Sequence, residues 1–325
     1  MSQQTPKMIW KAIDEHILKP VSEHFLRYHF TKRTDFARRF VFFAYALDKA
    51  VPGTAVKIIK KIGEIRGAEK ERYEQIVQAL CELVIAKKFL ESFPHKNGYA
   101  YEWEPVDLNG NNPEFMISCK KWRLLVEVKC PSLLEYEAKN RNAKGQVVGR
   151  FPHVKDITEN LYGKGTIALP LDNKIKDFLS SAEKKFSSFS EITIPTYGLL
   201  FVCWGQRMFE AITPISNPGC GLLTDRSFNK PNGEIAKYPH VNGVIVTQHQ
   251  FFLQEILAER RCPGKLQGLD YGEYWTWGSP PNPTFCRNPW AKNISPNEFE
   301  TALQTVPAGQ SLDPISQEMD FIHWL

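Results

Sequence analysis

The sequence NPEFMISCKKWRLLVEVKCPS, residues 112–132, has the pattern of two short strands joined by a tight turn. Two apolar runs, Phe115–Cys119 and Leu124–Val128, flank the polar pair Lys120-Lys121. Short apolar runs on either side of a polar pair predict a β-hairpin. We therefore expect residues 115–128 to form two antiparallel strands.

The second of these strands presents an acid and an amine together. Side chains alternate between the two faces of a strand, so Glu127 and Lys129 share one face, whereas Val126, Val128 and Cys130 share the other. Burial of the valines in the core would leave the carboxylate and the amine on the opposite face.

The register of the hairpin predicts a second acid beside the first. A two-residue turn at Lys120-Lys121 pairs position 119 with 122 and position 117 with 124, and it would bring Glu114 opposite Glu127. Their Cβ atoms would then be roughly 5 Å apart. Two like charges so placed are destabilising unless a positive group lies between them. A divalent cation such as Mg²⁺, which prefers oxygen ligands and is commonly held by one or two carboxylates, would meet that need.

These residues resemble the signature of a nuclease superfamily. Pro113-Glu114, followed after twelve residues by Glu127-Val128-Lys129, is similar to the motif of the PD-(D/E)xK superfamily, with Glu114 where Asp is usual. The string VEVKCPS resembles a strand of lambda-type recombination exonucleases. The spacing and the preceding helix resemble archaeal-type Holliday junction resolvases. The resemblance implies a restriction-endonuclease-like α/β fold, a mixed sheet flanked by helices.

The same resemblance assigns roles to these residues. It implies that Glu114, Glu127 and the backbone carbonyl of Val128 hold Mg²⁺ or Mn²⁺. Lys129 would help to orient the attacking water and would stabilise charge on the phosphate.

A further acid is expected from the helix predicted over residues 69–92. Glu82 lies inside the apolar segment Ala79–Ala86, where a carboxylate is rare unless it is paired or near a metal. In resolvase-like members of the superfamily, a helix before the first strand carries a glutamate that faces the active site, which implies this role for Glu82. The alternative is a surface glutamate or one bonded to Arg or Lys, and Glu74 on the same face is the second choice.

Asp107 is a rival for the first acid of the motif. It follows the strand predicted at Tyr99–Val106 and lies in a loop whose Asn109-Gly110-Asn111 sequence is typical of turns. A loop does not fix its distance from Glu127, so Glu114 is preferred.

The amino-terminal part of the chain is basic. The first 70 residues hold about twice as many Lys and Arg as Asp and Glu, although the net charge of the whole chain is only +5. Lys57, Lys60 and Lys61 fall on one side of a predicted short helix. Phosphate contact is one interpretation of these lysines, and a solvated surface is the other.

The pattern predicts three regions. They are a helical, basic region at residues 1–68, a nuclease-like core at 69–250 and a C-terminal extension at 251–325. Within the core, a helix at Leu171–Ser188, a buried strand at Thr196–Trp204 and a further strand at Val241–Thr247 would complete the mixed sheet, and about 133–170 would form a long irregular insertion. The insertion could fold over a substrate, or it could be an insertion without a role. The Trp- and Pro-rich stretch at 262–290 is expected to pack over the core, with stacking on unpaired bases as the alternative.

Cysteine usage and hydropathy argue against a disulfide framework, a zinc site and a membrane-spanning segment. Seven scattered cysteines, an odd number, argue against a disulfide framework and favour the reducing cytoplasm. The absence of a CxxC motif argues against a zinc site; Cys262, Cys286 and His249 stay open as ligands, with buried thiols preferred. The longest apolar run, Phe40–Leu47, is too short to span a bilayer.

The sequence thus predicts a metal-dependent nuclease, and the resembled families point to DNA in restriction, defence, recombination or repair. Two alternatives remain: an inactive nucleic-acid-binding module of the same fold, and a non-enzymatic interaction protein. If one site per chain cuts both strands, a homodimer is favoured.

Overall fold

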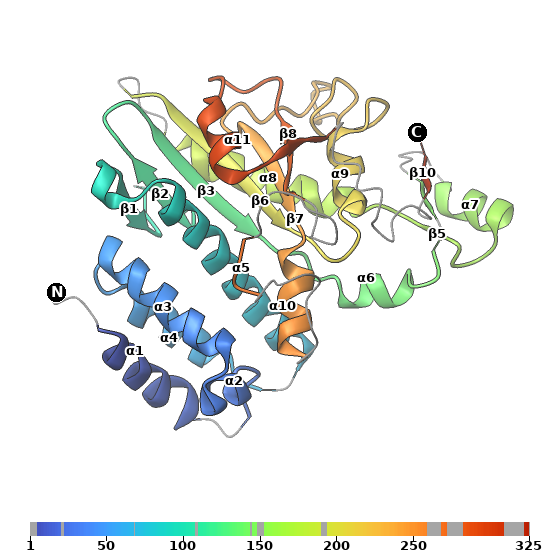
Figure 1. Ribbon diagram of the computed structural model, residues 1–325. Helices are drawn as coiled ribbons and strands as arrows, with labels where there is room; N and C mark the ends of the chain where they lie inside the picture. The colour runs from blue at the N-terminus through green and yellow to red at the C-terminus, as the bar shows by residue number, and fades with distance from the viewer. Residues whose placement is uncertain are drawn as a thin grey trace.

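The computed structural model describes residues 5–20, 23–67, 69–107, 110–143, 145–147, 153–189, 194–258, 268–271, 282–308 and 322–324. Among these residues a mixed seven-stranded sheet forms the centre of an α/β fold (Figure 1). This agrees with the coarse fold class expected from the sequence.

The main sheet has the strand order β1-β2-β3-β6-β7-β8-β9. The β1–β2 and β2–β3 pairs are antiparallel, β3, β6 and β7 are parallel to one another, β8 is antiparallel to β7, and β9 is parallel to β8. The bounds are β1 Ala100–Trp103, β2 Phe115–Ser118, β3 Arg123–Lys129, β6 Thr196–Cys203, β7 Gly243–Thr247, β8 Thr284–Arg287 and β9 Val306–Pro307.

The central strands are apolar on both faces because helices cover both. β6 is almost wholly buried and alternates between two cores, with Phe201 in the core on the α5 side and Leu200 in the core on the α8 side. The α5-side core is the larger, and α10 and α11 also contribute to it. The other core is formed with α8 and α9. The helices are α5 Lys70–Ser92, α8 Asp172–Ser187, α9 Phe209–Ser216, α10 His249–Leu257 and α11 Asn297–Leu303.

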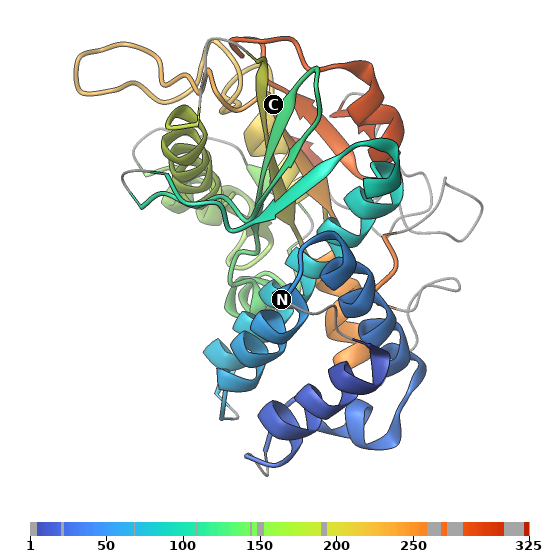
Figure 2. The ribbon, with the colours of Figure 1, turned by 90° about the vertical axis from the view of Figure 1, so that its left-hand side faces the viewer.

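The amino-terminal helices pack on the outer side of α5 (Figures 1 and 2). They are α1 Pro6–Ile13, the π-helix η1 Asp14–Leu18, α2 Arg27–Lys32, α3 Asp35–Ala50 and α4 Thr54–Glu64, and the short η2 His95–Asn97 follows α5. Their apolar faces share one core with α5 and the sheet, as the helical periodicity predicts. No helix in the described part of the chain is both long and apolar enough to cross a membrane.

The segment expected to be a long irregular insertion is largely structured. It contains α6 Leu134–Lys139, β4 Gly145–Val147, α7 Val154–Tyr162 and β5 Ile167–Ala168. The strands β4 and β5 form a second, small sheet with β10 Ile322–Trp324, which lies more than 150 residues later in the sequence. The strands are only two or three residues long, too short for the period of the sequence to reveal them.

The C-terminal region contributes strands to the main sheet. β8 pairs with β7, and β9 pairs with β8. Much of the aromatic stretch expected to cover the core, residues 272–281 among them, lies outside the described residues.

The hairpin forms in the predicted register. Ile117 pairs with Leu124, and the amide of Cys119 donates to the carbonyl of Trp122 at 3.0 Å, which closes a two-residue turn at Lys120-Lys121. Val126 faces the α5-side core and Leu125 the α8-side core. Strand alternation therefore places Glu127 on the face of α8.

Candidate active site

The candidate site lies where β2 ends and β3 continues. Regular pairing stops at Phe115 opposite Val126, and the amide of Glu114 donates to the carbonyl of Val126 at 3.0 Å. Glu114 thus lies one residue beyond the ladder, rather than inside it as the simple register predicts. β3 continues to Lys129 beside β6, so its last residues have no β2 partner on the other side.

Beyond Val126, β3 presents a backbone acceptor to the side on which β2 has ended. Carbonyls two residues apart in a strand point the same way, and the carbonyl of Val126 points to β2. The carbonyl of Val128 therefore points past the end of β2, to the side where Glu114 lies.

Glu127 is fully buried, and its two carboxylate oxygens differ in their hydrogen bonds. Its Oε1 accepts hydrogen bonds from Lys129 Nζ at 2.6 Å and from Lys185 Nζ at 2.7 Å. Its Oε2 is buried and has no hydrogen-bond partner among the described residues. A buried carboxylate oxygen without a partner is costly, so a ligand for Oε2 would be stabilising.

Glu82 is a second buried acid, held from both sides. Its Oε2 accepts from Lys61 Nζ at 3.0 Å, and its Oε1 accepts from Gln78 Nε2 at 3.2 Å. Burial raises the pKa of Glu82, and the charge of Lys61 opposes that rise. The sequence left open whether Glu82 faces the site or is bonded to a cation, and the structure shows that it is bonded to Lys61.

Glu114 shares its surroundings with the other two acids. Burial, followed by the negative charges of Glu82 and Glu127, raises the pKa of Glu114 to about 8. Burial alone would lower the pKa of Lys129, but the charge of Glu127, then those of Glu114 and Glu82, leaves it above its ordinary value. Glu114 and Lys129 therefore each interact electrostatically with the other predicted catalytic residues.

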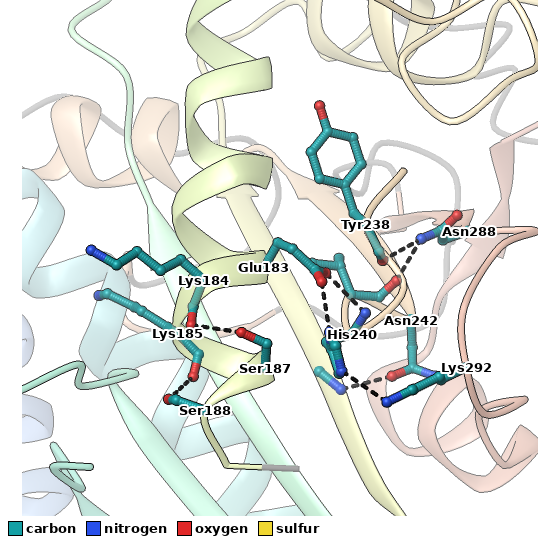
Figure 3. A network of polar contacts seen from close by, with 12 residues as sticks. Glu183, Lys184, Lys185, Ser187, Ser188, Tyr238, His240, Asn242, Asn288 and Lys292 are labelled. Atoms are coloured by element: carbon teal, nitrogen blue, oxygen red, sulfur yellow. Dashed lines mark hydrogen bonds and ion pairs between the residues drawn. The ribbon is translucent and has the colours of Figure 1, made fainter. Parts of the chain in front are cut away.

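Lys185 is a site residue that sequence reasoning missed. Helical periodicity puts it on the outer side of α8 with its neighbours, but its ammonium reaches Glu127. In Figure 3, Lys185 and Lys184 extend away from Glu183, which hydrogen-bonds His240 on the other side of the helix. Lys184 is exposed, whereas Lys185 is half-buried. No pattern within one helix distinguishes them, because the distinction comes from β3.

Lys61 belongs to the acid cluster as well as to the basic helix. Phosphate contact together with Lys57 and Lys60 was one interpretation of Lys61 and a solvated surface the other, yet its ammonium is bound by Glu82 and lies 3.7 Å from Oε1 of Glu104. Lys57 and Lys60 are exposed on the same helix, α4. Glu104 is a further acid that the sequence did not indicate.

The rival acids lie in other contacts. Asp107 accepts hydrogen bonds from the amide and the side chain of Asn111, as expected of a turn residue. Glu74 accepts from the hydroxyl of Ser132 at 2.5 Å. Neither contact involves the acid cluster. Of the alternative zinc ligands, Cys286 is in the α8-side core and Cys262 lies outside the described residues.

The comparisons with known proteins do not place this chain in a family. No family model, curated protein or solved structure matches it. Interpretation of the site therefore depends on its geometry and on the motif.

The residues present fit a hard divalent cation. Glu127 Oε2 lacks a hydrogen-bond partner in the described part of the chain, Glu114 interacts electrostatically with two other acids, and the Val128 carbonyl points past the end of β2. All three are oxygen donors, the type that Mg²⁺ and Mn²⁺ prefer.

Proposed function

We propose that this protein is a metal-dependent nuclease that hydrolyses phosphodiester bonds of DNA. The observation that supports it best is Oε2 of Glu127, a buried carboxylate oxygen without a hydrogen-bond partner among the described residues. Lys129 binds the other oxygen of this carboxylate, and the charge of the carboxylate helps to raise the pKa of Glu114. An acid pair with a neighbouring lysine is the arrangement that the PD-(D/E)xK motif implies.

In this proposal Glu114, Glu127 and the Val128 carbonyl hold the ion. A bound Mg²⁺ or Mn²⁺ would polarise the scissile phosphate and lower the pKa of a bound water. Lys129 keeps its proton, because the surrounding glutamates raise its pKa, and so it can stabilise negative charge that develops on the phosphate.

Lys185 and Glu82 complete the site. Lys185, like Lys129, binds Oε1 of Glu127, so Oε2 stays available for a ligand. It also brings a second ammonium to the place where the phosphate would lie. Glu82 holds Lys61 and is a candidate to orient water at the ion.

The polymer is assigned from charge and from the resemblance. Lys60 precedes Lys61 in sequence, and Lys57 lies one helical turn earlier, so α4 presents exposed cations next to the acid cluster. A polyanion bound along α4 would pass close to Glu82. DNA, rather than RNA, follows from the substrates of the resembled families.

A second function is favoured by one specific observation. Lys61, Lys129 and Lys185 pair with the acids and partly balance their charge in the absence of an ion. A protein of this kind could bind nucleic acid without cutting it. The basic amino-terminal helices would then bind the nucleic acid, and the acid cluster would have no catalytic role.

Cleavage assays separate the two functions. The protein is incubated with supercoiled, linear duplex and single-stranded DNA, and with RNA, with and without Mg²⁺ or Mn²⁺. We expect metal-dependent DNA cleavage that is lost in Glu127→Gln and in Lys129→Met, while salt-sensitive DNA binding remains. Binding without cleavage by the wild type would support the inactive module, and cleavage that survives both substitutions would refute the assigned site.

A further inference from the structure

Three cysteines that are far apart in sequence meet on the face of the sheet covered by α5. The Sγ atoms of Cys81, Cys130 and Cys203 all lie within 4.8 Å of one another. No two of them form a disulfide. Cys81 and Cys203 are fully buried, and Cys130 is partly buried.

The fold explains why they meet. β3 and β6 pair in parallel up to Lys129 opposite Val202, so Cys130 and Cys203 follow at equivalent positions one residue later. Both belong to the α5-side core. Cys81 comes from α5, which packs across these strands.

We propose that Cys81, Cys130 and Cys203 bind a zinc ion. In a tetrahedral site with zinc–sulfur bonds of about 2.3 Å, the sulfur atoms are about 3.8 Å apart, which the observed cluster permits. Three sulfur donors select a soft or borderline ion and disfavour Mg²⁺. The site is therefore chemically distinct from the oxygen site at Glu127.

His249 is the candidate for a fourth ligand, and its ring would have to move toward the ion, because its nitrogens do not lie within 4.8 Å of all three sulfur atoms. Its ring is buried, and its Nε2 lies 3.0 Å from the carbonyl oxygen of Tyr271. Because a carbonyl only accepts, Nε2 carries the proton and Nδ1 keeps its lone pair. Nδ1 is buried without a hydrogen-bond partner among the described residues, and His249 interacts electrostatically with Cys203. A ring nitrogen that donates to a backbone carbonyl is typical of zinc-bound histidine.

The zinc site would position residues of the oxygen site. Cys81 directly precedes Glu82, and Cys130 directly follows Lys129. An ion bound by both cysteines would fix α5 to the end of β3. With His249 drawn to the ion, all four donors would belong to the protein and no position would be left for a substrate, so the role would be structural.

Metal analysis of the untagged protein, purified under reducing conditions without added metal, tests the proposal. We expect about one zinc ion per chain, measured by elemental mass spectrometry. Cys203→Ser and Cys130→Ser should lose it, and the control Cys286→Ser, which changes a buried cysteine outside the cluster, should keep it. Wild type without zinc, or zinc retained by both cluster variants, would overturn the proposal, and so would stoichiometric iron in its place.

Cobalt exchange tests the same site in the wild-type protein, so its result does not depend on whether a variant folds. Wild-type protein stripped of zinc and loaded with Co²⁺ should show thiolate-to-cobalt charge-transfer absorption, and its absence would also overturn the assignment. Glu127→Gln should keep zinc whether or not the wild type cuts DNA. Failure of the nuclease proposal therefore leaves this result unchanged.

Discussion

Glu114 gives the sharpest prediction, because its environment opposes its charge. Its pKa is raised from 4.5 to about 8, first by burial and then by Glu82 and Glu127. Between pH 4.5 and about pH 8 the folded protein binds more protons than the unfolded chain, so the free energy of unfolding falls as pH rises. Each pH unit contributes about 1.4 kcal/mol, and the whole interval contributes up to about 5 kcal/mol.

The substitution Glu114→Gln should remove this dependence. Near pH 5 the wild-type carboxyl is protonated and resembles the amide, so the two proteins should be similarly stable. Near pH 8 the variant should be the more stable by several kcal/mol, measured by urea denaturation. Glu102→Gln, which changes an exposed acid on β1, is the matched control and should follow the wild type.

Mg²⁺ adds a second arm to the same experiment. An ion shared by Glu114 and Glu127 favours the ionised carboxyl, so millimolar Mg²⁺ should stabilise the wild type more near pH 8 than near pH 5 and should affect Glu114→Gln less. If wild type and Glu114→Gln show the same pH dependence without metal, the three acids are not crowded together and the site as described is wrong.

Three further predictions follow from single contacts. Lys185→Met should reduce the rate of DNA cleavage about 100-fold, whereas Lys184→Met, the exposed neighbour, should leave it close to wild type. The double substitution Lys57→Ala and Lys60→Ala should weaken DNA binding and reduce the slope of log affinity against log salt by about 2, measured by fluorescence anisotropy; an unchanged slope would exclude α4 from the interface. Gly198→Ala should lower the free energy of unfolding by about 1–3 kcal/mol in urea denaturation, because its Cβ would overlap the ring of Phe186 and a backbone carbonyl, and a neutral effect would show that β6 can shift.

The sequence predicted the local parts of the site well. The hairpin, its turn and the alternation that separates Glu127 from Val126 depend only on residues near in sequence, and the structure shows each of them. Glu82 was singled out by a local signal too, a charge within an apolar segment, and it is buried as that signal implies. Its role in catalysis stays a prediction.

The features that the sequence did not predict depend on contacts between residues distant in sequence. Lys185 is unremarkable on α8 until β3 supplies Glu127. The cysteine cluster has no motif, because the register between β3 and β6, and not a loop spacing, brings Cys130 beside Cys203. The small sheet could not be predicted for the same reason, since β4 pairs with β10, which is distant from it in sequence.

The balance of charge at the end of β3 connects these observations. Three glutamates and three lysines meet there, yet the lysines are unequally shared: two hold one oxygen of Glu127, one holds Glu82, and Glu114 is left with the raised pKa. Above about pH 8 Glu114 ionises, and its charge then adds to that of Glu127, whose Oε2 has no hydrogen-bond partner among the residues described. A divalent cation bound by Glu114 and Glu127 would offset both effects at one position. Metal binding at this site should therefore release a proton from Glu114, and proton release on addition of Mg²⁺ near neutral pH would be direct evidence for the proposed ion.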